Sequence, residues 1–373
     1  MNRLIYTFIC CTLLFIGCNK PSKYQGLEMN FEEIIHIPLP NIEDSFLFKF
    51  SSAISDIKYV KLEETTNSII GNLSQLEIAN NGDFIVFDIG NKKVLRFDSC
   101  GHFLNAIGER GHGPNEYVDP FYMAYDSYHN QVMITDYGKQ QILSYKLTGE
   151  ITNRINTPYY NCGIQPLDKE HTLYYRSYNN SEGYNFIVNK NESSECTYFD
   201  PLPEKDLLSY SPCLVGAITN GDGNKILCRP PYSSIIYEID GTKVRPKYQL
   251  DFNTSVWLLG TTKDLKNVFK SKAKNSIFSL YEVNDKLFMS CTIGNHGYEY
   301  YYDPKGKALA GKYMTNDIDG KYNIFSIIKA KGKRFYSECI ADYFADKAKN
   351  NTEFIEKNGK GINPWIMICT VKD

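Results

Sequence analysis

The sequence lacks the charge excess and the short motifs that would point to common enzyme classes or to nucleic acid. Its 373 residues carry 41 Lys and Arg against 43 Asp and Glu, a formal net charge of -2. Such a chain has no positive field for phosphate backbones, which excludes nucleic acid as the expected partner. It also lacks a Gly-x-Ser-x-Gly elbow, a P-loop and a dinucleotide fingerprint, so hydrolase, nucleotide and hydride chemistries have no motif in their favour.

Beyond the N-terminal segment, the cysteines lack the close spacing of zinc ribbons and redox motifs. They are Cys100, Cys162, Cys196, Cys213, Cys228, Cys291, Cys339 and Cys369. The first four leave one or two disulfides open, whereas the last three and Cys228 lie in apolar runs and are expected to be buried free thiols. The six His residues show no metal-binding spacing, so we expect neither a metal nor another cofactor.

Long apolar runs are absent except near the N-terminus, where Arg3 precedes the apolar residues 4–16 and Cys18 follows. This layout resembles a bacterial lipoprotein signal peptide over residues 1–17, with Cys18 as the lipidated first residue and residues 18–30 as a polar tether. Lipid on Cys18 would hold the protein on a membrane. Phe15 and Ile16 depart from the usual motif, so an ordinary secretory signal or an uncleaved anchor stays open.

Residues 19–23 lack the acidic cluster associated with surface export. We therefore expect an outer-membrane lipoprotein that faces the periplasm rather than the cell surface.

A sustained helical period is also missing, and short β-rich segments alternate with turns instead. Residues 84–107 hold two strands, a Gly turn and a third strand, and residues 132–155 repeat this pattern. Weaker copies follow. The six copies begin near Phe84, Val132, Thr172, Ile226, Leu287 and Phe335. Spacings of about 40 to 60 residues are typical of propeller blades or solenoid units. The sequence therefore predicts an all-β fold, a six-bladed β-propeller over residues 31–373.

A ring of blades has to be closed. Residues 57–62 and 363–369 both have strand-like patterns, and we expect them to join one sheet and lock the two ends of the propeller together. Residues 262–281 and 339–357 have a helical composition instead. They are interpreted as short helical insertions on loops of late blades, either binding partners or covering a blade edge.

The most specific stretch is residues 101–117, which includes Gly111-His112-Gly113-Pro114 and ends at Glu116-Tyr117. This pattern predicts the outer strand of one blade, followed by a link rich in Gly and Pro that crosses to the next blade. Together with residues 97–104, Asp136, Ile142, Tyr145 and Asn363-Pro364, it resembles the six-bladed β-propeller lipoproteins of Bacteroidetes, which are similar to NHL-repeat and TolB-like propellers. The resemblance spans the mature chain and implies fold and location, without a chemistry to assign.

Two sets of residues are candidates for ligand binding. Arg110, His112, Glu116 and Tyr117 belong to the crossing, where a structural role in the turn is the alternative. Asp88 and Asp136 end the first apolar strand of two repeats, where they are expected either to converge on a central channel or to hydrogen-bond nearby backbone.

Two functions remain open. The first is a non-enzymatic, lipid-anchored binding or interaction scaffold for a peptide, glycan or protein partner at one face of the ring. Tyr-rich stretches such as Tyr159-Tyr160, Tyr174-Tyr175 and residues 298–302 suit sugar stacking or protein contact. The second is a channel-centred enzyme, a lyase or hydrolase that acts on glycans or peptides. A third possibility is a structural subunit of an envelope complex.

Overall fold

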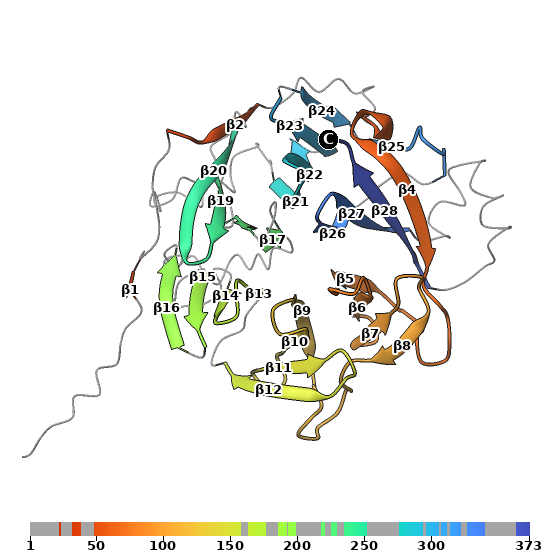
Figure 1. Cartoon of the computed structure of the whole chain (residues 1–373), viewed down its shortest axis with the longest axis vertical. Helices are drawn as coiled ribbons and strands as arrows, with labels where there is room; N and C mark the ends of the chain where they lie inside the picture. Colours follow the sequence, from red (N-terminus) through yellow and green to blue (C-terminus); the bar gives the residue numbers. More distant parts are fainter. Residues whose placement is uncertain are drawn as a thin grey trace, which may run out of the picture.

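In a computed structural model of the chain, six small antiparallel sheets form a ring around a central axis, which makes the fold a six-bladed β-propeller (Figure 1). The structure describes residues 22–23, 32–38, 48–157, 163–176, 186–191, 193–198, 218–220, 225–229, 235–251, 276–293, 296–305, 307–311, 314–321, 327–339 and 363–373. Within these ranges the one helical turn is η1 (Phe50–Ser52), and no helix has the length and apolar character to cross a bilayer.

Each blade has its first strand nearest the axis and three further strands outward (Figure 1). Blade 1 contains β5 (Leu73–Ile78), β6 (Phe84–Asp88), β7 (Lys93–Phe97) and β8 (Phe103–Ala106). Blade 2 contains β9 (Pro120–Asp126), β10 (Gln131–Asp136), β11 (Gln141–Lys146) and β12 (Ile151–Asn156). Blade 3 contains β13 (Gly163–Pro166), β14 (His171–Tyr175), β15 (Phe186–Lys190) and β16 (Ser193–Tyr198).

The later blades follow the same order. Blade 4 contains β17 (Ile218–Asn220), β18 (Ile226–Cys228), β19 (Ile235–Asp240) and β20 (Lys243–Asp251). Blade 5 contains β21 (Ser276–Val283), β22 (Lys286–Ile293), β23 (His296–Asp303) and β24 (Lys307–Gly311). Blade 6 contains β26 (Ile327–Lys331), β27 (Arg334–Cys339), β28 (Trp365–Val371) and β4 (Ile54–Lys61).

The six predicted repeats are confirmed, because every predicted starting point falls at the beginning of the second strand of a different blade. These second strands lie inside each sheet, and the adjacent blades pack against both faces of the sheet, so their side chains are covered on both sides. All five residues of β6 are buried, for example. Covered strands favour continuous apolar runs, which is why the second strands gave the clearest sequence signal.

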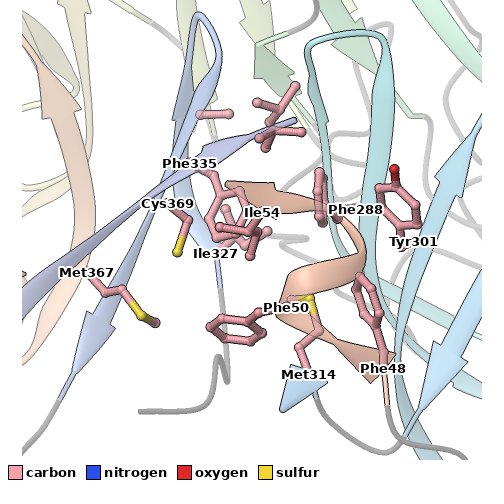
Figure 2. Close-up of a cluster of buried hydrophobic side chains, with 14 of the residues drawn as sticks. Phe48, Phe50, Ile54, Phe288, Tyr301, Met314, Ile327, Phe335, Met367 and Cys369 are labelled. Carbon is pink, nitrogen blue, oxygen red and sulfur yellow. The ribbon is translucent and has the colours of Figure 1, made fainter. Parts of the chain in front are cut away.

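The predicted closure of the ring is also confirmed. β4, from the N-terminal region, pairs antiparallel with the C-terminal β28, from Trp365 opposite Lys61 to Val371 opposite Ile54. Figure 2 shows the core behind this seam, where Phe48 and Phe50 lie with Phe335 from blade 6 and Phe288 from blade 5. Burying each such ring contributes about 1.5 to 3 kcal/mol, so the chain ends are held by apolar contacts as well as by strand pairing.

The N-terminal segment adds short strands to the outer edges of other blades. β1 (Ser22–Lys23), which lies within the predicted tether, pairs parallel with β16, and β2 (Ile35–Pro38) pairs parallel with β20. β3 (Phe48–Lys49) pairs with β25 (Met314–Thr315). Such additions cover sheet edges that would otherwise expose unpaired backbone groups.

The helical insertion predicted over residues 262–281 is wrong for its last six residues, Ser276 to Tyr281, which begin β21. Pairing with β22 overrides their helical composition. The rest of that insertion, and the second one beyond Cys339, lie outside the described residues.

The four cysteines predicted to be buried free thiols, Cys228, Cys291, Cys339 and Cys369, are confirmed. Cys196 is also buried and free, and Cys100 is free and exposed. Cys162, Cys213 and the predicted lipidation site Cys18 lie outside the described residues.

Candidate functional site

The ring has two faces that differ in what they carry. We call the face at which the innermost strands end the AB-turn face, because the turns joining first and second strands lie there. The opposite face, which carries the link from β8 to β9, is the crossover face. All six predicted ligand-binding residues lie at or near the crossover face, since β6 and β10 run toward it and the link follows β8.

Asp88 ends β6 and is completely buried. Its carboxylate accepts hydrogen bonds from the main-chain N–H groups of Gly71 and Asn72, each at 2.9 Å, and from the Asn91 side chain at 2.7 Å. These groups belong to the chain entering β5 and to the next turn. The contacts therefore match the backbone-bonding alternative given for this residue, and ligand binding by Asp88 stays a prediction.

Asp136 has the same role in blade 2. It accepts hydrogen bonds from the main-chain N–H groups of Val118 at 2.9 Å, Asp119 at 2.8 Å and Gly138 at 3.0 Å. A Cβ at Gly138 would lie 2.7 Å from the Val118 side chain, so glycine lets the incoming chain cross close to this turn. Asp88 and Asp136 thus fix the entry of the first strand in two successive blades.

The Gly-rich link between blades 1 and 2 folds over its own glutamate. Glu116 accepts a hydrogen bond from the Gly113 N–H at 2.6 Å. A Cβ on Gly111 would lie only 2.0 Å from the Glu116 carboxylate, and one on Gly113 would lie 2.9 Å from it. Neither glycine has a positive φ. They are needed because the carboxylate occupies the space that a side chain would fill.

The remaining residues of this link attach it to both blades. Tyr117 is 1% exposed, and its ring lies edge-on to Tyr145 of blade 2 at 6.4 Å between centroids. Arg110 donates a hydrogen bond to the Val118 carbonyl at 3.3 Å, and Lys139 donates to two carbonyls of the link. His112 is exposed. These contacts show that the link forms the crossing between blades 1 and 2. A ligand-binding role for its residues stays a prediction.

At the AB-turn face, the described residues of all six blades surround one cavity of about 120 Å³ on the axis, here called the axial cavity. Its lining residues are Glu77, Ile78, Tyr125, Ser127, Tyr128, Gln165, Pro166, Ile226, Glu282, Lys329, Ala330, Lys331 and Gly332. Convergence of several polar groups on a concave surface is typical of ligand sites. The sequence-based candidates did not include any of these residues.

An ion pair crosses the cavity wall between the first and last blades. Lys329 of β26 contacts Glu77 of β5 at 2.7 Å, with side chains 11% and 14% exposed. Lys331, two residues further along β26, donates to the main-chain carbonyls of Ile78 at 2.8 Å and Ala79 at 3.1 Å. Burial, together with the charge of Lys329, lowers the pKa of Lys331, and the attraction of Glu77 opposes this.

The register of the sheets explains how these residues meet. Six residues on the innermost strands pair with the residue that follows each predicted repeat start. They are Glu77, Ala124, Gln165, Thr219, Tyr281 and Lys329. Three of them line the axial cavity. The sequence signal that could have found them is the alignment of the repeats: counting back from each repeat start to the same position on the preceding strand gives these residues.

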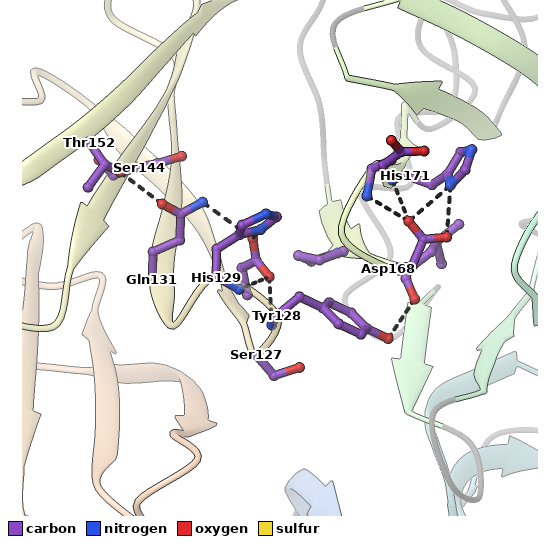
Figure 3. A network of polar contacts seen from close by, with 12 residues as sticks. Ser127, Tyr128, His129, Gln131, Ser144, Thr152, Asp168 and His171 are labelled. Carbon is purple, nitrogen blue, oxygen red and sulfur yellow. Dashed lines mark hydrogen bonds and ion pairs between the residues drawn. The ribbon is translucent and has the colours of Figure 1, made fainter.

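Two blades hold their AB turns with Asp–His pairs, which Figure 3 shows. Asp126 contacts His129 at 2.7 Å, and Asp168 contacts His171 at 2.8 Å. Tyr128 of blade 2 donates a 2.6 Å hydrogen bond to a carbonyl in the blade 3 turn, which joins the two. Burial raises the pKa of Asp168, but hydrogen bonds from backbone N–H groups and His171 outweigh it, so the pKa is lowered. No three His, Cys, Asp or Glu side chains are placed to hold a metal in the described part of the chain.

Glu282, the second acidic residue of the cavity wall, belongs to a charge network between blades 4 and 5. It is 3% exposed and accepts hydrogen bonds from Lys247 at 2.8 Å and from the Tyr248 hydroxyl at 2.8 Å. Lys247 also contacts Glu238 at 2.7 Å. Burial raises the pKa of Glu238, but the hydrogen bonds from Lys247 and Arg245 outweigh it and lower the pKa to about 2.

The chain is similar to several solved structures at low sequence identity. A Bacteroides fragilis protein named as exported has a TM-score of 0.69 at 17% identity, with 91% of this chain and 100% of that chain covered. A Bacteroides vulgatus member of the DUF4221 family has a TM-score of 0.48 at 11% identity, covering 86% and 97%. Virginiamycin B lyase from Staphylococcus aureus has a TM-score of 0.42 at 11% identity, covering 76% and 81%.

No curated protein matches the chain in sequence. A family match covers residues 32–370, which is nearly the whole propeller and includes every residue of the axial cavity. The chain therefore belongs to the family described as a domain of unknown function, DUF4934.

Proposed function

We propose that this protein is an exported, lipid-anchored propeller of the cell envelope that binds a polar group of a glycan, peptide or protein partner in the axial cavity. The observation that carries the proposal is that all six blades contribute residues to one polar cavity at the AB-turn face. A ligand in this position contacts strands and turns that the ring holds rigidly, so its binding groups are already positioned before it arrives.

The charged groups of the cavity favour binding over catalysis. Glu77 is paired with Lys329, and Glu282 accepts hydrogen bonds from Lys247 and Tyr248. A general acid or base has to reach the substrate with its carboxyl group, whereas these two carboxylates are already engaged by lysine and tyrosine side chains. Such paired groups are suited to accept and donate hydrogen bonds to a ligand.

The cavity is small relative to ordinary small-molecule sites, which measure about 300 to 1,000 Å³. At about 120 Å³ it accommodates a single end group, with the rest of the partner outside over the turns. Ser127 is exposed in the AB turn of blade 2, and Tyr128 lies beside it. A larger partner would extend across these turns.

Photo-crosslinking in intact cells tests the proposal. A benzophenone amino acid replaces Ser127 at the cavity, and in a control it replaces Leu104, which is 45% exposed on the outer strand β8. We expect an adduct from position 127 and none from position 104. Equal adducts from both positions, or none from position 127, would count against the cavity as the binding site.

Membrane anchoring through Cys18 is tested separately by labelling cells with a radioactive fatty acid. Incorporation into the wild type and its loss in Cys18→Ala support lipidation. Protease treatment of intact cells then tests the proposed periplasm-facing placement, because only a surface-exposed propeller is degraded. Degradation in intact cells would contradict that placement.

A further inference from the structure

Lys331, which lines the axial cavity, has one N–H group for which no acceptor is found among the described residues. The Lys331 ammonium donates to the carbonyls of Ile78 and Ala79, and an ammonium group has three donors. The acidic residue that interacts with it, Glu77, is already paired with Lys329. A third N–H of Lys331 therefore remains for a group that enters the cavity.

The axial cavity has one cation, Lys331, that forms no ion pair with a carboxylate among the described residues, since Glu77 pairs with Lys329 and Glu282 with Lys247. Its lining holds the carboxylates Glu77 and Glu282 and the cations Lys329 and Lys331. Glu282 is also neutralised from behind by Lys247. Lys331 is exposed, and besides partial desolvation the neighbouring charge of Lys329 contributes to its lowered pKa, an effect that a negative charge beside Lys331 would oppose. An anion is thus the ligand that this arrangement stabilises.

The uncharged lining groups suit a ligand with several hydroxyls. Gln165 and Ser127 both carry groups that donate and accept hydrogen bonds. Thr219, at the same register as Gln165 in the next blade, is 7% exposed, and its hydroxyl has no hydrogen-bond partner among the described residues.

We propose that the axial cavity binds the carboxylate and a ring hydroxyl of a sugar acid, with Lys331 contacting the carboxylate and Gln165 contacting the hydroxyl. This inference rests on the proposed function and names the ligand class of the same site. A peptide C-terminus carries the same carboxylate but lacks the ring hydroxyls. It is therefore the competing source that the experiment has to separate.

Isothermal titration of the mature chain tests this with three probes: glucuronate, glucose and N-acetyl-diglycine. We expect glucuronate to bind about tenfold more tightly than glucose, because a charge-assisted hydrogen bond is about twice as strong as a neutral one. N-acetyl-diglycine should bind more weakly than glucuronate. The preference should also decrease at high salt.

Three variants assign the effect to one side chain. Lys331→Gln should reduce glucuronate affinity to that for glucose, and Lys331→Arg should retain the preference because it keeps the charge. Lys146→Gln, an exposed lysine on β11 that pairs with Glu150, is the matched control and should change nothing. Thermal melting of each variant shows whether it is folded.

Each other outcome overturns the inference. If glucuronate binds no more tightly than glucose, or if Lys146→Gln weakens binding as much as Lys331→Gln, the carboxylate contact is absent. If N-acetyl-diglycine binds more tightly than glucuronate in a Lys331-dependent way, the sugar acid is wrong while the cavity remains a binding site. The crosslinking at position 127 is independent, so its failure alone would refute the proposed function.

Discussion

Blades 1 and 2 differ from blades 5 and 6 at one position of the repeat. Four residues after the repeat start, the first pair has Asp88 and Asp136, and the last pair has Cys291 and Cys339. All four are buried. The aspartates accept hydrogen bonds from the backbone that enters the blade, whereas the cysteines are free thiols in apolar surroundings.

Two half-buried acids elsewhere in the last two blades, Glu299 and Glu338, have raised pKa values. Burial raises the pKa of Glu299 to about 8, although the hydrogen bond from Ser290 opposes this, and burial raises the pKa of Glu338 to about 7. The fourth residue after the repeat start is thus either an aspartate whose carboxylate accepts backbone N–H hydrogen bonds, as in blades 1 and 2, or an apolar cysteine, as in blades 5 and 6. The comparison implies that polar contacts stabilise the first two blades and that the last two are sensitive to pH.

The largest effect is expected from removing the acceptor in blade 2. Asp136→Ala removes a buried carboxylate that accepts three main-chain N–H hydrogen bonds, and a hydrogen bond to a charged group contributes about 1.5 to 3 kcal/mol. We expect the free energy of unfolding to decrease by about 3 kcal/mol, measured by urea denaturation.

Asp119→Ala is the control for this variant, because Asp119 is half exposed and pairs only with Lys92 at the surface. We expect a decrease of less than about 0.5 kcal/mol. Similar losses in both variants would show that Asp136 does not hold the crossing.

The pH dependence of the last blades comes next. Glu299 has an ordinary pKa of 4.5 and a folded pKa of about 8, so between these values the folded state binds more protons than the unfolded state. Its contribution is fully present below about pH 4.5 and is lost as the pH rises to 8. We expect stability to fall over this range by on the order of 2 kcal/mol. Denaturation midpoints from pH 5 to pH 8.5 measure it.

Glu299→Gln should flatten that decrease, because the glutamine does not titrate. Glu338 acts in the same direction up to about pH 7, so the double variant Glu299→Gln/Glu338→Gln should flatten it further. An unchanged slope in Glu299→Gln would refute the mechanism.

A smaller effect tests the link between blades 1 and 2. In Gly111→Ala the new Cβ displaces the Glu116 carboxylate, which loses its hydrogen bond with the Gly113 N–H. We expect Gly111→Ala and Glu116→Ala each to cost about 1 to 2 kcal/mol, which is the value of one charge-assisted hydrogen bond. The double variant should cost little more than Glu116→Ala alone, as measured in a double-mutant cycle. Full additivity would contradict the contact.

The sequence predicted the architecture better than the site, and the reason is physical. The second strands are covered on both faces, so their apolar runs from Phe84 to Phe335 mark all six blades. The link around Gly111 and Glu116 is one continuous stretch, so its sequence pattern was recognisable. The contacts of these residues hold the connection between blades 1 and 2. Glu77 and Lys329, by contrast, stand at opposite ends of the propeller sequence and meet only because the ring closes. Single residues of this kind have no local pattern.

The smallest effects concern the cysteines. Cys339→Ser places a hydroxyl in the core formed with Phe335 and Met367, where an unsatisfied polar group costs about 1 kcal/mol or more. Cys100→Ser changes an exposed thiol in the turn before β8 and should alter the free energy of unfolding by less than about 0.5 kcal/mol. Urea denaturation under reducing conditions measures both. Because burial raises the pKa of the Cys339 thiol well above its usual range, Cys100 should also react with maleimide far faster than Cys339 in the folded protein. Equal reaction rates would mean that blade 6 opens readily, which would contradict the view that Cys339 lies in a stable apolar core.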